Sequence, residues 1–349
     1  MNTKKRPGLT PLVGIALDSP VRFKKVRAKD LTVAKAKIKR TVERAPEVLV
    51  KVSGGVRGAV HLKSHMDYIT RNCRLEAETE RGEVVDNVDA LRSVHHEWSR
   101  QLGKTRANQR DTVNIVLSMP EGTDPEAVQR AARGFAKEQF AHHQYLMALH
   151  TPENDPQAKG HKGTKNPHVH LTVKSLGFDL TRLNPRKADL AEWRESFAEQ
   201  MRQQGWDAEA TPRRARGVIL KPLKQIVWNL ANAKERPGSR VQAAKIKEAA
   251  TELKQGRGGT ANPYRKQIVE TQKLVRQGWL DGANTLDASP NSEDKALAQK
   301  IRSFVASFPK DMQDERTKIK AALVESIEKN RATARQPNNE PEREDKLDR

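Results

Sequence analysis

The stretch that decides the fold is NPHVHLTVK, residues 166–174. Polar and apolar residues alternate from His168 to Lys174, which is the period of a β-strand with two different faces. His168 and His170 therefore project from one face, and Val169 and Leu171 from the other. Two imidazoles on one strand face form a natural metal clamp. Two polar residues on a solvent-exposed face are the alternative, which this pattern alone leaves open.

A third histidine ends the preceding apolar segment. QYLMALH, residues 144–150, predicts a short strand that finishes at His150. Consecutive strands usually lie close together, so His150 is expected near His168 and His170. Three neutral imidazoles leave coordination positions open, as a catalytic metal requires. We therefore predict a divalent metal held by these three histidines.

A nucleophile beside such a metal can be chosen by elimination among the three tyrosines. Tyr145 lies five positions before His150, so strand alternation places it on the opposite face. Tyr264 belongs to a later helical region. Tyr68 follows a predicted strand, within the helical pattern of residues 60–71, and is the predicted nucleophile. A tyrosine phosphodiester keeps the bond energy for religation. A half-buried ring on an amphipathic helix is the alternative.

Two arginine groups are predicted to hold DNA phosphates. Arg71 and Arg74 form the first group and lie three and six positions after Tyr68. Arg213, Arg214 and Arg216 form the second group, with no acidic residue between positions 211 and 221. A solvated linker is the alternative for the second group.

The periodic patterns predict an α+β chain in four parts. Residues 1–46 form a basic, flexible arm, and residues 47–220 form the domain that holds the chemistry. Residues 221–330 form a helical accessory region, and residues 331–349 are too polar to fold alone. Strands are predicted at 47–55, 112–118, 144–150 and 168–174, and helices at 60–71, 88–102, 124–142 and 186–206.

Charge and cysteine content narrow the partners and the compartment. A net charge of +21 attracts polyanions, because each neutralised phosphate releases counterions. Nucleic acid is the expected partner. No apolar run is long enough for a spanning helix, and the N-terminus lacks the features of a signal peptide. Cys73 is the single cysteine, which fits a reducing cytoplasm.

Four segments resemble, in family order, the motifs of plasmid relaxases, the mobilisation nucleases that include the T-DNA border endonuclease. MDYITRNCRLEAE resembles the tyrosine motif, and NIVLSMPEGT resembles the second motif. YLMALH with NPHVHLTV resembles the histidine-hydrophobic-histidine metal motif of these HUH-type transesterases. DAEATPRRARG resembles the arginine-rich segment that follows. Together they cover roughly half of the chain.

The resemblance implies a fold and a reaction. The fold is a central antiparallel five-stranded sheet with flanking helices, the metal on the open face, and the tyrosine helix beside it. Tyr68 would cut one strand at an origin of transfer, remain on the 5′ phosphate, and later rejoin the strand. Ser118 takes the place of the family residue that contacts DNA. Imidazole ligands favour Mn²⁺ on affinity, whereas cellular abundance and the family favour Mg²⁺.

The resemblance also implies partners and a route. These are origin-of-transfer DNA, single-stranded at the nick, a relaxosome accessory protein, and a type IV secretion coupling protein. The protein would act in the bacterial cytoplasm and leave with the transferred strand for the recipient cell.

The base that takes the proton of Tyr68 is open. Relatives often have a carboxylate two residues after the first metal histidine, where this chain has Pro152. Glu153 and Asp155 lie just beyond it and are the candidate catalytic carboxylates. Asp67 is a third candidate, although neighbouring helix residues diverge.

Three competing functions differ in their requirements. A rolling-circle replication initiator shares the tyrosine chemistry, but the tyrosine and arginine motifs favour mobilisation. A two-histidine phosphoesterase needs a second His-x-Thr/Ser strand motif, and His61 has the wrong spacing. A non-catalytic basic accessory protein would leave the grouping of Tyr68, Ser118 and the histidines unexplained.

Overall fold

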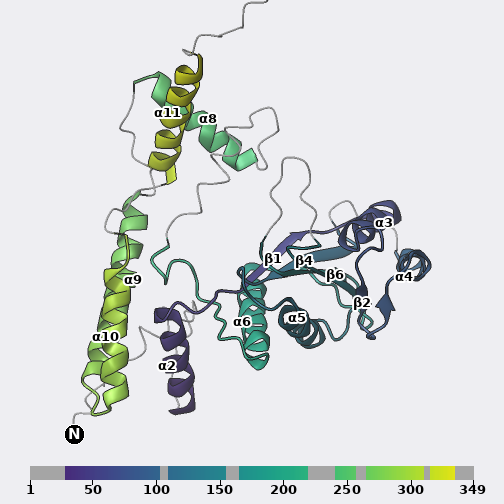
Figure 1. Cartoon of the computed structure of the whole chain (residues 1–349), viewed down its shortest axis with the longest axis horizontal. Helices are drawn as coiled ribbons and strands as arrows, with labels where there is room; N and C mark the ends of the chain where they lie inside the picture. Colours follow the sequence, from purple (N-terminus) through teal and green to yellow (C-terminus); the bar gives the residue numbers. More distant parts are fainter. Residues whose placement is uncertain are drawn as a thin grey trace, which may run out of the picture. The chain divides into compact units, whose positions relative to one another are not determined.

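The computed structural model describes residues 28–102, 109–154, 165–218, 240–256, 265–309 and 315–334 (Figure 1). The chain divides into two compact units: unit 1 is Met1–Val21 with Pro212–Arg349, and unit 2 is Arg22–Thr211. Unit 2 contains one antiparallel sheet with flanking helices, which confirms the predicted α+β class. None of the described helices has the length and apolar character needed to cross a membrane.

The sheet has six strands in the order β1-β4-β6-β5-β2-β3. The predicted strands are present as β1 (Leu49–Gly54), β4 (Thr112–Ser118), β5 (Tyr145–His150) and β6 (His168–Lys174). The sequence did not predict β2 (Ala77–Thr79) and β3 (Val84–Val85), which pair at the β5 edge. They bring the strand count to six instead of the expected five. Strands of three and two residues among charged side chains are too short to display an alternation.

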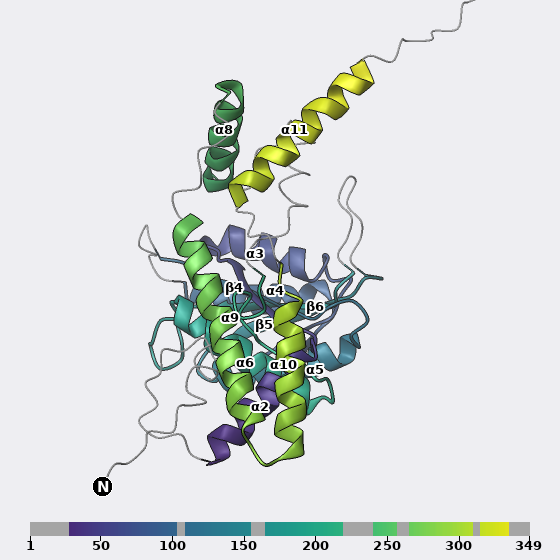
Figure 2. The same cartoon turned by 90° about the vertical axis from the view of Figure 1, so that its left-hand side faces the viewer.

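Helices cover both faces of this sheet (Figures 1 and 2). α5 (Pro125–Gln139) and α6 (Lys187–Gln203) pack on one face, against the odd-numbered residues 169, 171 and 173 of β6. α3 (Gly58–Ile69) and α4 (Val88–Arg100) pack on the other face, against Leu146 and Ala148 of β5. The even-numbered residues of β6, including the two histidines, therefore face the α3 side.

α5 shows how local sequence fixes the first of these layers. The Asp124 side chain caps the helix by accepting hydrogen bonds from the backbone N–H groups of Glu126 and Ala127. Small alanines on the buried side let the helix approach the sheet, and Phe135 meets Phe197 of α6 at 6.1 Å between ring centroids. Truncation of a core Phe to Ala typically costs about 3–5 kcal/mol.

Part of the predicted flexible arm is instead an ordered helix, α2 (Ala28–Val42). Ala34, Ile38 and Val42 recur at helical spacing and are buried. Lys37 pairs with Glu195, and the Arg40 Nε atom donates to a Glu209 carboxylate oxygen at 2.9 Å. The apolar stripe was overlooked because lysines separate its members. Residues 1–27 lie outside the described part of the chain.

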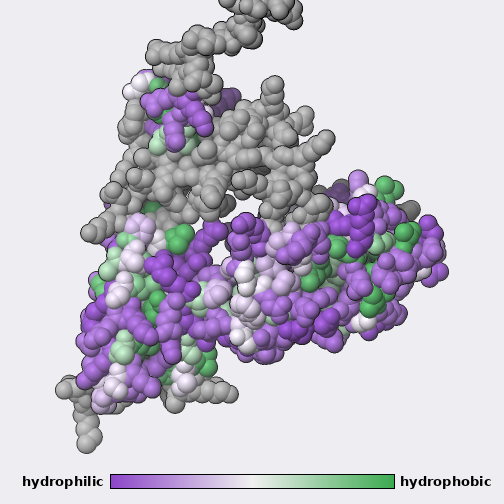
Figure 3. All heavy atoms as spheres, viewed as in Figure 1, coloured by the Kyte–Doolittle hydropathy of each residue, from purple (hydrophilic) through white to green (hydrophobic). Residues whose placement is uncertain are grey.

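The described part of unit 1 is built from two helix pairs. α9 (Arg265–Asp287) packs with α10 (Ser292–Ala306), where Trp279 meets Phe304 at 5.5 Å between centroids. α8 (Arg240–Lys254) packs with α11 (Glu315–Ala334) through Ala249 and Ile319. On the face drawn in Figure 3, most described residues are hydrophilic. Residues 219–239 and those beyond residue 334 lie outside the described residues.

Candidate active site and metal centre

Strand register brings the three predicted histidines together. β5 and β6 are antiparallel, with His150 directly opposite His168, and His170 lies two residues further along the same face. The ring centroid of His150 lies 5.2 Å from that of His168 and 4.5 Å from that of His170. One nitrogen from each ring lies within 4.8 Å of the others. This spacing allows all three to bind a single ion.

Main-chain hydrogen bonds orient two of the three rings. Nδ1 of His168 lies 3.0 Å from the Asn166 carbonyl oxygen, and Nε2 of His150 lies 2.7 Å from the Ile69 carbonyl oxygen. A carbonyl only accepts, so these nitrogens carry the protons, and the lone pairs are on Nε2 of His168 and Nδ1 of His150. This is the usual arrangement by which outer groups fix metal-binding histidines.

The electrostatics of the cluster favour neutral imidazoles. Burial, with smaller electrostatic contributions from His150, His168, His65 and Arg71, lowers the pKa of His170 to about 3. Neutral imidazole is the form that binds metal. The donor set, its spacing and the neutral form of His170 therefore fit a divalent ion, as the resemblance to relaxases implies.

Tyr68 lies beside this cluster on α3. Its ring meets His170 edge-on, with centroids 5.5 Å apart, and half of the residue surface is exposed (50%). Leu62, Met66 and Ile69 occupy the buried side of the helix and fix its position on the sheet. The predicted nucleophile and the predicted metal ligands are thus brought together, with Tyr68 open to a substrate.

Tyr145 does not share these properties. Tyr145 is buried (2% exposed) in the core on the opposite face, as strand alternation predicted. Burial, with smaller contributions from the negative charges of Glu78 and Glu80, raises its pKa to about 12. Tyr264 lies outside the described residues.

A left-handed turn follows α3 and brings Arg71 to the site. Arg71, Asn72 and Cys73 have φ angles of 52°, 55° and 60°. L-residues in this region cost roughly 1–2 kcal/mol each, with Asn tolerating it best. The turn places the Arg71 guanidinium 5.1 Å from the centre of the Tyr68 ring and 3.4 Å from Nδ1 of His150. Strain of this kind persists where surrounding contacts enforce it, often at functional sites.

Sequence reasoning missed His65. It lies one turn before Tyr68 on α3, with ring centroids 6.1 Å apart, and its Nε2 atom lies 2.9 Å from Thr172 Oγ1. Burial lowers the pKa of His65, which favours the neutral ring. Its helical spacing from Tyr68 was the available signal.

The other residues predicted to bind DNA lie in several different places. Ser118 pairs with His168 across β4 and β6, and its hydroxyl donates to the Pro167 carbonyl at 3.2 Å. Arg74 is exposed in the turn after α3. Its role and that of Ser118 in DNA binding remain predictions. Arg213 and Arg214 are exposed on a turn in unit 1, and Arg216 is half-buried there.

None of the carboxylates proposed as the base contacts Tyr68 within the described residues. Asp67 pairs with Lys63 at 2.5 Å. Glu153 is exposed, and a hydrogen bond with Thr151 lowers its pKa. Asp155 lies outside the described residues. The assignment of a carboxylate base therefore remains a prediction.

Comparison with known proteins agrees with this geometry. Residues 68–206 match the family model of the MobA/VirD2-like relaxase nuclease domain. The chain carries a relaxase nuclease domain. The match begins at Tyr68 and includes the three histidines, whereas the arginine group at 213–216 lies beyond it.

The chain resembles curated proteins along more than half of its length. It is 25% identical over 229 residues to the T-DNA border endonuclease VirD2 of Rhizobium radiobacter, covering 59% of this chain and 50% of that protein. It is 23% identical over 247 residues to the T-DNA border endonuclease VirD2 of Agrobacterium fabrum (strain C58), covering 64% and 51%. The chain spans about half the length of these relatives.

Proposed function

We propose that this relaxase nicks one strand of plasmid DNA at an origin of transfer and later rejoins it. The observation that carries the proposal is the edge-on placement of the exposed Tyr68 ring against His170, within the cluster of three histidines. A metal ion serves cleavage by neutralising phosphate charge, and it needs a nucleophile within reach. Tyr68 meets that requirement.

The proposed reaction is a transesterification. Tyr68 Oη forms a bond to phosphorus while the bond from phosphorus to the 3′ oxygen breaks. The phenolic proton passes to solvent, which reaches the half-exposed ring, and the departing 3′ oxygen takes up a proton. The product is a 5′ phosphotyrosyl linkage with a free 3′ hydroxyl. Attack by that hydroxyl, or by an equivalent one after transfer, reverses the step.

The residues around Tyr68 would bind the metal, supply positive charge and position α3. His150, His168 and His170 would hold a Mg²⁺ or Mn²⁺ ion, which supplies charge neutralisation at the scissile phosphate. Arg71, over the Tyr68 ring, adds positive charge on the side where negative charge develops during the reaction. Thr172 and His65 fix the position of α3 over the sheet.

The proposal extends to the biological route. The protein would act on its plasmid in the bacterial cytoplasm, together with an accessory protein, and be exported with the strand through a coupling protein. The T-DNA border endonucleases, which it resembles over about half their length, are named for cleavage at DNA borders. That similarity supports origin cleavage here.

The decisive experiment is detection of the covalent adduct. Single-stranded oligonucleotides tiled across the non-coding DNA beside the gene are incubated with protein and Mg²⁺ or Mn²⁺, then run on denaturing gels. Wild-type protein should shift the label of a 3′-end-labelled oligonucleotide, because Tyr68 stays on the 5′ phosphate of the 3′ fragment. Tyr68→Phe should give no adduct while still binding DNA. Tyr145→Phe is the matched control and should keep the adduct. A normal adduct yield in Tyr68→Phe would refute the proposal.

A further inference from the structure

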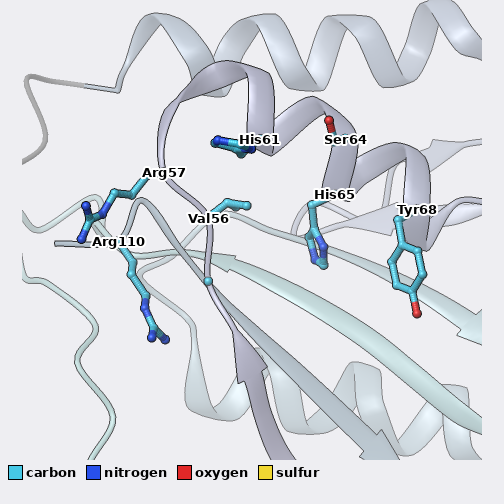
Figure 4. Close-up of a pocket in the computed structure, with 8 residues that line it drawn as sticks. Val56, Arg57, His61, Ser64, His65, Tyr68 and Arg110 are labelled. Carbon is cyan, nitrogen blue, oxygen red and sulfur yellow. The ribbon is translucent and has the colours of Figure 1, made fainter. Parts of the chain in front are cut away.

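A hollow of about 590 Å³ adjoins Tyr68 on the side of α3 where the helix begins (Figure 4). His65 and Tyr68 lie at one end, and the side chains of Arg57 and Arg110 lie at the other. Apart from Tyr68 and Arg110, the lining residues precede the segment that matches the relaxase family model. The family match therefore does not account for this hollow.

One face of α3 supplies most of its wall. His61, Ser64, His65 and Tyr68 recur at i, i+3, i+4 and i+7, so they lie in one row along the helix. The opposite face is buried in the core and holds the helix in place. The row presents two imidazoles and a phenol, whose flat rings suit stacking against nucleobases.

The two arginines come from segments that are firmly tied together. The Asp111 backbone N–H donates to the Val56 carbonyl at 2.8 Å, and the Arg57 Nε atom donates to the Gln109 carbonyl at 2.7 Å. Gly55 permits this approach, because a Cβ there would lie 2.2 Å from the Thr112 carbonyl oxygen. The hollow thus has a preorganised cationic rim.

The lining chemistry selects the ligand. The described lining residues include two guanidinium groups and two imidazoles but no carboxylate. Such a site favours an anion that also carries a flat ring, and its volume falls in the range of small-ligand sites. Since Tyr68 forms one wall of the hollow, a ligand bound there lies next to the group that Tyr68 attacks, or is part of the same molecule.

We propose that this hollow is a subsite for single-stranded DNA adjoining the scissile phosphate, with a backbone phosphate on Arg57 and Arg110 and a base against His61. This inference rests on the proposed function and assigns the path of the strand on one side of Tyr68. Recognition of the backbone by the arginines is independent of sequence, while base stacking tolerates every base.

Salt dependence of binding tests the arginines. Affinity for a fluorescein-labelled oligothymidine is measured over a range of salt concentrations. The double variant Arg57→Gln/Arg110→Gln should lower the log–log salt slope by about 0.7, the value for one lost phosphate contact on a single strand. Arg130→Gln, on α5 at the opposite face, removes a charge without entering the hollow and should leave the slope unchanged. A wild-type slope in the folded double variant would overturn the proposal.

Crosslinking tests the base position and does not require these substitutions to be tolerated. Wild-type protein is irradiated with oligothymidine that carries single 5-iodouracil residues, and the attached peptide is sequenced. Crosslinks should fall within residues 55–68 or at the peptide that contains Arg110. His61→Ala should weaken binding by at least about fivefold. Crosslinks confined to other segments, or competition by dTMP as strong as by the oligonucleotide, would overturn the proposal.

The two proposals fail in different ways. A changed salt slope without any covalent adduct would keep the strand subsite and refute the nicking reaction. A normal adduct with an unchanged slope and crosslinks elsewhere would keep the reaction and refute the subsite.

Discussion

His150 donates a hydrogen bond from Nε2 to the main-chain carbonyl of Ile69, over 2.7 Å. The bond joins the end of β5 to the last residue of α3, directly after Tyr68. Both residues are fully buried. His150 therefore also anchors the helix that carries Tyr68. The distance between Tyr68 and the histidine cluster is thus set by a strand and a helix that are fixed to each other.

His170→Ala tests the metal site. His168 is almost fully buried, so its loss would also disturb folding. His170 is less buried and suits a clean test. Mn²⁺ at a hundred times its Kd should stabilise wild-type protein by about 2.7 kcal/mol but give no such increase in His170→Ala, measured by thermal unfolding.

Cleavage should follow the same pattern. His170→Ala should form no adduct, whereas His96→Ala, an exposed histidine on α4, should behave as wild type. Adding EDTA to wild-type protein should stop cleavage. Undiminished cleavage in EDTA would show that the histidines do not act through a metal.

Arg71→Ala tests the charge held over Tyr68. We expect the rate of adduct formation to fall at least about tenfold, because a preorganised cation near the developing charge is lost. Arg71→Lys should recover part of the rate, since it keeps the charge but not the planar guanidinium. Arg92→Ala on α4 is the control. A wild-type single-turnover rate in Arg71→Ala would contradict a role in the reaction.

Gly55→Ala tests the close approach of the β1–α3 connection to β4. The added Cβ would lie 2.2 Å from Thr112 O and 2.7 Å from Arg110 Cδ. Relief of this clash should lower the free energy of unfolding by about 1–3 kcal/mol, measured by urea denaturation. Gly54→Ala is the matched control, because nothing lies within 4 Å of its Cβ position. Equal stability of the two variants would disprove the packing argument.

The arginine group in unit 1 gives a separate binding prediction. Replacing Arg213, Arg214 and Arg216 by Gln should lower the salt slope of single-stranded DNA binding by roughly 2, about 0.7 for each phosphate contact. Arg213 and Arg214 are exposed, as phosphate contacts require. An unchanged slope would identify the group as a solvated linker.

Truncation near Lys221 separates chemistry from transfer. The sheet, Tyr68 and the histidines all lie in unit 2, so we expect the shortened chain to form the adduct in vitro. Plasmid transfer between cells should be lost, because we expect the coupling protein to recognise the helical region after Lys221. Loss of the adduct together with the melting transition would instead make those helices part of the catalytic fold.

The main strands and helices of unit 2 could be predicted because their signals are local. Alternation in β6 placed His168 and His170 on one face, and Asp124-Pro125 marked the start of α5. The same alternation predicted that Tyr145 faces away from the histidines, and its buried position in the core confirms this. The short β2–β3 hairpin and the helix α2 were missed, because charged residues interrupt their apolar patterns.

The sequence by itself therefore determined which residue types carry the chemistry and which face of each strand they occupy. Only the tertiary structure brings His65 into contact with Thr172 and places the Arg71 guanidinium over the Tyr68 ring. It also places Arg57 and Arg110 on the wall of the same hollow. Alternation and helical spacing are properties of neighbours in the chain. Strand register and helix placement depend on burying both faces of the sheet at once, so contacts between distant segments emerge only from the packed fold.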